Sequence, residues 1–158
     1  MSDDETRRAF IQAIHADPFC AITRGVYADW LDEHGDDKRA LILRAGNMPL
    51  TGLDEACAYE LAHCRFGNES FDDRFSKAIV EEYTSRTPAW LTVKQWLWMW
   101  VLTRRYRKTV RNAGVKALAE KRYKHFCEVL DLDWLKPHER RLTVKNKARR
   151  YMLPTLFD

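Results

Sequence analysis

Glycine and proline are scarce in this sequence, which has six glycines and five prolines among 158 residues. Sandwiches and barrels built from short strands need such residues at frequent turns, so their scarcity favours helices. Apolar residues supply 46% of the chain and aromatic residues 12%, which can fill the core of one compact domain or of two small lobes that share a core. We therefore expect an all-α fold of about eight helices.

Cysteine is equally sparse, and its spacing matches no disulfide or metal-binding framework. Within one predicted helix Cys57, His63 and Cys64 could approach one another, but a fourth zinc ligand at a suitable spacing is missing. We predict no metal site and no cofactor. Because no secretory signal precedes the cysteines, which are Cys20, Cys57, Cys64 and Cys127, we expect them to stay reduced in the cytoplasm.

Long apolar runs are absent as well. The longest extends from Trp96 to Leu102 and is closely followed by Arg104 and Arg105. A membrane-spanning helix needs roughly 18 or more apolar residues in succession. The sequence therefore predicts no membrane segment.

Apolar residues recur with the period of an α-helix along most of the chain. One such segment ends at Gly35, which can adopt a left-handed capping conformation, and Asp36 or Asp37 can cap the short helix that follows. Thr92 and Gln95 form a capping box that predicts the start of a long helix. The predicted helices cover residues 4–16, 22–34, 37–45, 54–64, 71–85, 92–112, 114–131 and 139–152.

Charge is divided unevenly along the chain, although the net charge is only +4. The part before residue 91 has 10 basic and 17 acidic side chains and the part after it has 17 basic and 6 acidic ones, giving −7 and +11. Such asymmetry indicates a lobe that binds a polyanion, or two lobes that attract each other. We predict a helical module at 1–50, a helical connector packed on it at 51–90, and a basic helical lobe at 91–158.

The predicted helix at 92–112 carries the most distinctive charge pattern. Four cations share one face at i, i+3, i+4 and i+7 spacing and would repel one another in an isolated helix, which indicates an anionic partner. They are Arg104, Arg107, Lys108 and Arg111. Trp100 lies one turn before Arg104 on the same face, where an exposed indole could stack on a base. We expect this helix to be amphipathic, with its cationic face outward.

Two further groups of cations follow on the next predicted helices. The helix at 114–131 carries Lys116, Lys121, Arg122 and Lys124, and the helix at 139–152 carries Arg141, Lys145 and Arg149. Since an ordinary solvated surface intersperses both signs of charge, three consecutive basic helices indicate one cationic patch. We predict that this patch neutralises the phosphates of DNA or RNA.

A set of motifs near the start of the chain carries a family resemblance. The motifs are Ala-Ile-His-Ala-Asp-Pro at 13–18, Val-Tyr-Ala-Asp-Trp-Leu at 26–31 within the segment 24–36, Arg-Ala at 39–40 and Ile-Leu-Arg at 42–44. Together they resemble the bacterial repeat-companion domain. The resemblance implies a small helical module with an accessory or interaction role, no established activity and no catalytic residue. From the residues themselves, we expect Arg24, Asp29 and Arg44 to form charge pairs between helices.

No complete catalytic set stands out in the sequence. Arg8 and His15 loosely fit the spacing of a family of helical ribonucleases, but His15 lies at the end of a predicted helix inside the module just described. The acidic doublets at 3–4, 36–37 and 72–73 fall at helix starts, where carboxylates cap amides. A nuclease would need a His or carboxylate cluster in the basic lobe, which offers only His125, Glu128, His138 and Glu139.

The sequence thus favours a non-enzymatic, nucleic-acid-binding accessory protein that acts through its basic lobe. The alternative, from a different class, is a protein–protein adaptor whose basic lobe grips an acidic partner while the module at 1–50 docks elsewhere. Both hypotheses require the cationic patch. They differ in the partner that the patch prefers at physiological salt, because nucleic-acid binding depends steeply on salt concentration.

Overall fold

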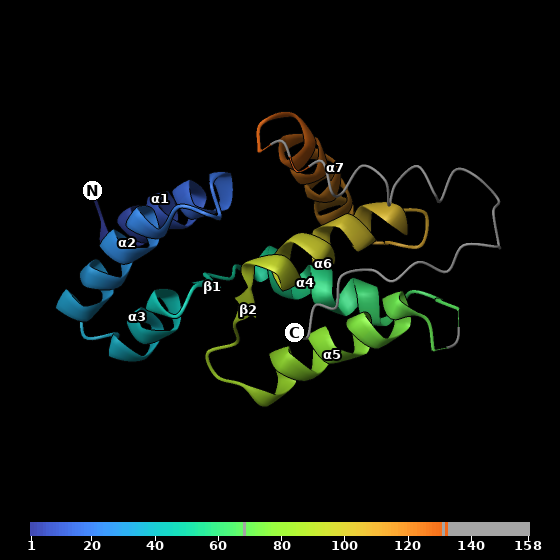
Figure 1. Ribbon diagram of the computed structural model, residues 1–158, viewed down its shortest axis with the longest axis horizontal. Coiled ribbons are helices and arrows are strands. Elements are labelled where there is room, and N and C mark those ends of the chain that lie inside the picture. Colours follow the sequence, from blue (N-terminus) through green and yellow to red (C-terminus); the bar gives the residue numbers. More distant parts are fainter. Residues whose placement is uncertain (68, 131, 133–158) are drawn as a thin grey trace.

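The computed structural model describes residues 1–67, 69–130 and 132, and the chain is mostly helical there (Figure 1). Within these ranges it forms seven α-helices and two strands of two residues each, which confirms the predicted all-α fold. The helices are α1 (Asp3–Ala16), α2 (Ala21–Glu33), α3 (Asp37–Arg44), α4 (Gly52–Ala62), α5 (Phe71–Ser85), α6 (Val93–Arg105) and α7 (Ala113–Glu128), and the strands are β1 (Asn47–Met48) and β2 (Leu91–Thr92). No helix among the described residues is long and apolar enough to cross a membrane.

Helices α1 to α3 lie together at one end of the molecule (Figure 1). Their ends follow from local sequence signals. Ser2 and Glu5 form a capping box at the start of α1, and Asp36 accepts the backbone amide of Arg39 at the start of α3. Gly35 follows α2 with a φ of 76°, which is the left-handed conformation predicted for it.

A charge cluster fixes α3 against α2. The guanidinium of Arg44 lies 2.6 Å from a carboxylate oxygen of Asp29 and 2.6 Å from one of Asp32. The predicted pair between Arg44 and Asp29 is therefore confirmed. Arg24 takes a different role, because its guanidinium donates to the carbonyl oxygen of Pro18.

A short two-stranded sheet links this end of the molecule to the rest of the fold. Strands β1 and β2 pair antiparallel, with Asn47 opposite Thr92 and Met48 opposite Leu91. The side chains of Met48 and Leu91 are buried, so the sheet is anchored in the core. Thr92 also accepts the backbone amide of Gln95 at the start of α6, which confirms the capping box predicted for these two residues.

Helix α6 is the centre of the fold. All residues from Trp96 to Thr103 are at most 5% exposed, and α4, α5 and α7 pack around the helix (Figure 1). A helix that is apolar around its whole circumference is buried on all sides, whereas an amphipathic helix buries one stripe. The prediction of an amphipathic helix with an outward cationic face is therefore wrong.

This helix also ends earlier than predicted. Helix α6 stops at Arg105, residues 106–109 form a turn, and α7 begins only after its N-cap, Asn112. By ending there, the chain carries Arg107, Lys108 and Arg111 out of the interior that α6 occupies, where an ammonium or guanidinium would be costly to bury. The four predicted cations therefore do not share one helix face.

The remaining helices among the described residues begin and end within three residues of their predicted bounds. The predicted helix at 71–85 coincides with α5. The predicted helix at 139–152 lies outside the residues that the structure describes.

Replacing either Leu97 or Met99 by Ala tests the burial of α6 on all sides. Leu97 lies on the face predicted to point outward and Met99 on the opposite face, yet both are fully buried. Each substitution is expected to lower the free energy of unfolding by about 2–5 kcal/mol, measured by urea denaturation. Val129 is 66% exposed, so Val129→Ala should change that free energy by less than about 0.5 kcal/mol. A cost for Leu97→Ala as small as this control's would contradict the central position of α6.

Candidate nucleic-acid interface

Six exposed cations lie on the loop at 106–112 and on α7, and they are termed the basic surface below. They are Arg107, Lys108, Arg111, Lys116, Lys121 and Lys124. Within the part of the chain that the structure describes, none of the six forms an ion pair. All six belong to the cationic patch predicted from the sequence.

Glu60 holds the loop at 106–112 through its backbone, and the cationic side chains of the loop are exposed, although Arg107 also donates to the carbonyl oxygen of Arg104 at 3.1 Å. Glu60 on α4 accepts the amide of Arg111 through Oε2 at 2.9 Å and the amide of Asn112 through Oε1 at 3.0 Å. Asn112 then caps α7 by accepting the amide of Val115 at 3.0 Å. Both oxygens of the Glu60 carboxylate are thus used by backbone groups, and the Arg111 guanidinium is exposed.

Helix α7 buries one face and exposes lysines on another. Val115, Ala119 and Phe126 form the buried face and have no exposed surface. Lys116 and Lys124 lie two turns apart on the solvent face, and Lys121 lies between them along the helix and is also exposed. These lysines, predicted as part of the cationic patch, are exposed, and they lie beside the loop because Asn112 joins the two segments.

Arg104, although predicted to bind phosphate, takes part in the contact between α6 and α7. Its Nε lies 3.1 Å from Oε2 of Glu120, and its side chain is 18% exposed. Its guanidinium also lies 4.1 Å from the centre of the Tyr123 ring. Arg104 is therefore engaged by the protein itself and is left out of the basic surface.

Trp100 is fully buried, so the prediction that it stacks on an exposed base is wrong. Its indole Nε1 donates to Oδ1 of Asp54 at 2.9 Å, and the indole of Trp96 donates to the same oxygen at 2.9 Å. Buried indoles supply much of the apolar core but need an acceptor for their N–H groups. Here the acceptor is a carboxylate from α4.

Asp54 is completely buried and accepts hydrogen bonds through both carboxylate oxygens. Besides the two indoles, Oδ1 receives Nη1 of Arg122 at 2.8 Å. Oδ2 receives the backbone amide of Thr51 at 2.8 Å and its hydroxyl at 3.0 Å. Burial is the largest single influence on the pKa of Asp54 and would raise it, but the charge of Arg122 and the hydrogen bonds to the carboxylate together outweigh burial, and the pKa lies below its usual value. The carboxylate is therefore ionised inside the core.

Arg122 is enclosed by this centre, and the prediction that it binds nucleic acid is wrong. Its side chain is 11% exposed, and its guanidinium lies 4.7 Å from the ring centre of Trp96 and 4.2 Å from that of Trp100. Its Nη2 donates to Nδ1 of His15 at 2.9 Å. Arg122 could reach a phosphate only by leaving Asp54 as an unpaired buried charge, which is strongly unfavourable.

His15 joins α1 to the same buried centre. Its Nε2 donates to the carbonyl oxygen of Pro49 at 2.8 Å while Nδ1 accepts from Arg122, so these partners assign the proton to Nε2 of a neutral ring. Burial lowers the pKa of His15, Asp54 opposes that effect, and Arg122 adds to it. Both ring nitrogens are used in structural hydrogen bonds, which leaves neither one open to a substrate.

The thiols of Cys57, in the middle of α4, and of Cys64, just after this helix, are also bonded within the protein. Sγ of Cys57 lies 2.9 Å from Oγ1 of Thr103, and Sγ of Cys64 lies 3.2 Å from Oγ1 of Thr109. Burial raises the pKa of both thiols, which disfavours the reactive thiolate. No group of three or more His, Cys, Asp or Glu within the described ranges is arranged to hold a metal ion.

The remaining predicted nucleic-acid ligands, Arg141, Lys145 and Arg149, lie outside the described residues. The centre formed by Asp54, Arg122 and His15 was not predicted from the sequence. Thr51 and Asp54 do form a capping box, and the spacing Thr-x-x-Asp is a recognisable signal for one. That signal marks a helix start but does not show that the capping carboxylate is buried.

Family models, curated proteins and solved structures give no match to this chain. The resemblance of its first third to the repeat-companion domain therefore stays a prediction.

Replacing Asp54 by Asn removes the charge that balances Arg122 and nearly preserves the side-chain volume. The buried guanidinium then lacks its counter-charge, so we expect the free energy of unfolding to fall by about 3–5 kcal/mol in urea denaturation. Asp29→Asn is the matched control because the Asp29 side chain is 71% exposed where it pairs with Arg44, and it should cost about 0–1 kcal/mol. Equal costs for the two substitutions would show that Asp54 is not a structural centre.

His15 is expected to make stability depend on pH between neutrality and mild acid. Its pKa in the folded chain lies below the ordinary value of 6.5, so below about pH 6.5 the unfolded chain binds more protons than the folded one. The free energy of unfolding therefore decreases as the pH falls through this range. Urea denaturation at a series of pH values should show a flatter dependence for His15→Gln than for the wild type. Parallel curves for the two proteins would contradict the assignment of this effect to His15.

Proposed function

We propose that this protein is a non-enzymatic, nucleic-acid-binding accessory protein whose basic surface neutralises phosphates. The observation that carries the proposal is the set of six exposed cations, on one loop and the helix after it, that form no ion pair within the described residues. Residues 91–130 contain 10 basic side chains and only two acidic ones, Glu120 and Glu128. A surface of one sign attracts a polyanion over distances of about a Debye length.

The ion pairs of this segment sort its cations into two groups. Arginines next to the core are paired across helices: Arg104 with Glu120, Arg105 with Asp72 at 3.4 Å, and Arg122 with Asp54. The cations of the basic surface lie farther from the core and have no such partner among the described residues. Since folding does not use their charge, an external anion is the partner that this arrangement supports.

Phosphate neutralisation would supply most of the affinity. With Trp100 buried, the proposal contains no aromatic platform for stacking and no group that reads base edges. Contacts to phosphates position a protein on nucleic acid but carry no sequence information. We therefore propose sequence-independent binding to DNA or RNA, to which Arg141, Lys145 and Arg149 would also contribute, and a reduced cytoplasmic setting consistent with four free thiols.

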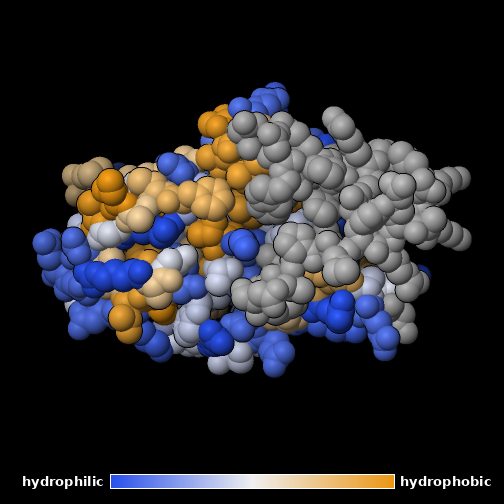
Figure 2. All heavy atoms as spheres, in the orientation of Figure 1, coloured by the Kyte–Doolittle hydropathy of each residue, from blue (hydrophilic) through white to orange (hydrophobic). Residues whose placement is uncertain are grey.

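A second candidate function, a protein–protein adaptor, is favoured by an apolar stripe at the other end of the molecule. Phe19, just before α2, and Ile22 and Val26, in its first two turns, are 52%, 78% and 51% exposed. Figure 2 shows apolar and charged residues mixed over the end formed by α1 to α3. Grouped apolar side chains at a surface are typical of protein contacts. In this function the basic surface would grip an acidic protein.

Changing Arg107, Lys108 and Arg111 together to Gln tests the proposed interface. Affinity for a labelled duplex and a labelled single strand should fall for every base sequence tested, because only phosphate contacts are lost. For the duplex, the slope of log K against log salt should flatten by about 0.9 for each contact removed, measured by fluorescence anisotropy between about 50 and 200 mM salt. The melting temperature should barely change, since exposed cations without ion pairs contribute little to stability.

The matched control removes three exposed cations from other parts of the molecule: Arg8, Arg74 and Lys94 to Gln. It has the same net charge as the first variant and should keep the wild-type affinity and salt slope. Unchanged binding in the first variant, or equal weakening in both, would refute the proposed interface. An acidic protein that displaces nucleic acid at physiological salt would favour the adaptor.

A further inference from the structure

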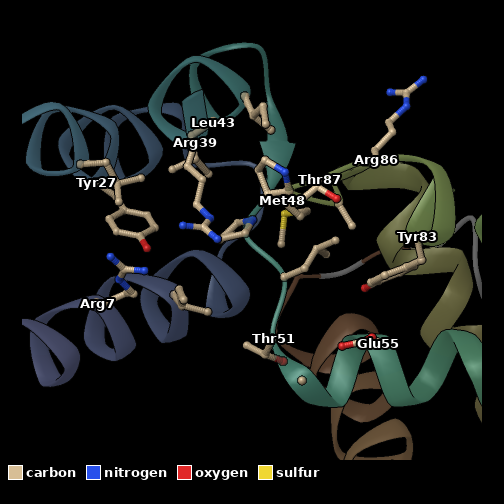
Figure 3. A pocket seen from close by; sticks show the side chains of 18 residues that line it. Arg7, Tyr27, Arg39, Leu43, Met48, Thr51, Glu55, Tyr83, Arg86 and Thr87 are labelled. Carbon is tan, nitrogen blue, oxygen red and sulfur yellow. The ribbon is translucent and has the colours of Figure 1, made fainter. Parts of the chain in front are cut away.

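A cavity of about 430 Å³ lies between the N-terminal helices and the segment that runs from the start of α4 to the residues before β2 (Figure 3). This volume is within the range of small-molecule sites. Much of the wall is apolar and includes the partly exposed side chains of Ile11, Ile42 and Leu50. None of its lining residues belongs to the basic surface, so the cavity is a separate candidate site.

Three arginines line the cavity, and they differ in their partners. Arg39 lies 2.6 Å from a carboxylate oxygen of Asp36, and Arg86 lies 2.9 Å from one of Glu82. Arg7 has no ion pair within the described residues, although its guanidinium lies 5.9 Å from the centre of the Trp30 ring, and its Nε is buried with no hydrogen-bond partner there. Figure 3 shows Arg39 pointing from α3 toward the middle of the cavity and Arg7 at its edge on α1, with its guanidinium beside the hydroxyl of Tyr27, whereas Arg86 points away.

The hydroxyl of Tyr83 is a second buried polar group in the same cavity with no hydrogen-bond partner among the described residues. Buried polar groups in folded proteins are nearly always hydrogen-bonded, so each exception calls for an explanation. Both groups belong to residues that line one cavity, so a molecule bound there can hydrogen-bond to both once each side chain turns slightly toward it. The hydroxyl of Tyr27 points toward Arg7 in Figure 3 and adds a further donor on that side.

The charges around the cavity fix the orientation of such a molecule. Arg7 and Arg39 enter from one side, and Glu55 lies on the other side next to Tyr83 (Figure 3). An anionic group is attracted to the arginines and repelled by Glu55. Arginine also matches the geometry of carboxylate and phosphate oxygens through its planar fork of donors.

We propose that this cavity binds a small organic anion with an apolar body. Its carboxylate or phosphate head group bonds to Arg7 and Arg39, and its body packs against the partly exposed side chains of Ile11, Ile42 and Leu50. A polar group of the molecule accepts a hydrogen bond from the hydroxyl of Tyr83. The site lies where the N-terminal helices meet the rest of the chain, so the bound anion contacts both parts.

Four probes with the same eight-carbon chain test the proposal by isothermal calorimetry on the full chain. Octanoate and octyl phosphate carry the two anionic head groups, octanol is neutral and octylammonium is cationic. At least one anion should bind about tenfold or more tightly than octanol, and octylammonium should bind most weakly. The stronger of the two anions identifies the head group as carboxylate or phosphate. Equal binding of anions and octanol, or no binding of any probe, overturns the proposal.

Arg7→Gln should reduce the affinity for the favoured anion to that for octanol, while leaving octanol binding unchanged. Arg8→Gln is the matched control, because Arg8 is the next residue on α1 and is exposed. If Arg7→Gln does not fold, Arg7→Lys keeps the charge but loses the planar fork and should lower the preference for the anion by about threefold or more. Equal anion affinities in the Arg7 and Arg8 variants overturn the assignment of the head-group site.

Tyr83→Phe tests whether the hydroxyl is an unpartnered group in the unliganded protein. Removing a buried hydroxyl that has no partner should leave the melting temperature unchanged or raise it, because no hydrogen bond is lost. A lowered melting temperature would show that the hydroxyl already has a partner, and it would remove one of the two observations on which the proposal rests.

Discussion

The arrangement of the helices depends on the buried carboxylate of Asp54. Five donor groups converge on its two oxygens, from the loop before α4, from two successive turns of α6 and from α7. A charge in a protein interior is tolerated only when it is paired and hydrogen-bonded. The hydrogen bonds to Asp54 therefore fix how α6 and α7 are positioned and rotated relative to α4. Arg122 also fixes the position of α1, because it is hydrogen-bonded to His15.

The same constraint accounts for where the positive charge of the chain lies. The part of α6 from Trp96 to Thr103 is buried in the interior, so this helix has no charged side chain between Lys94 and Arg104. Acidic side chains from α4, α5 and α7 neutralise the arginines closest to the core. The cations beyond them gather on the loop at 106–112 and on the outer face of α7, which is why the basic surface is strongly one-sided in charge.

Local signals in the sequence predict most of the helices, because capping and apolar spacing are properties of short segments. The helix at 71–85 and the capping box of Thr92 are examples. The error at α6 came from sorting its residues into two faces, although the run from Trp96 to Leu102 contains no polar position that could face solvent. The absence of a polar residue from this run indicates a helix that is buried on all sides.

The roles of single side chains could likewise be predicted only where they depend on nearby residues in the sequence. The exposure of Lys121 and Lys124 follows from their positions opposite the apolar stripe of α7, which is local information. The role of Arg122 depends on Asp54, which is 68 residues away in the sequence, so spacing within α7 could not reveal it. The cavity beside Arg7 and Tyr83 likewise joins distant segments.

The hydrogen bond between Arg122 and His15 spans 107 residues, and this separation has a consequence for the order of folding during synthesis. Contacts between distant residues form late, because closing a long loop costs chain entropy before the contact is gained. The pair between Arg44 and Asp29 spans only 15 residues and can form as soon as α3 has left the ribosome. The three tryptophans of α6 emerge before Arg122, which covers two of them. The nascent chain therefore passes through a stage in which the central helix lacks cover on the face that α7 later occupies, and association with other chains competes with folding most strongly at that stage.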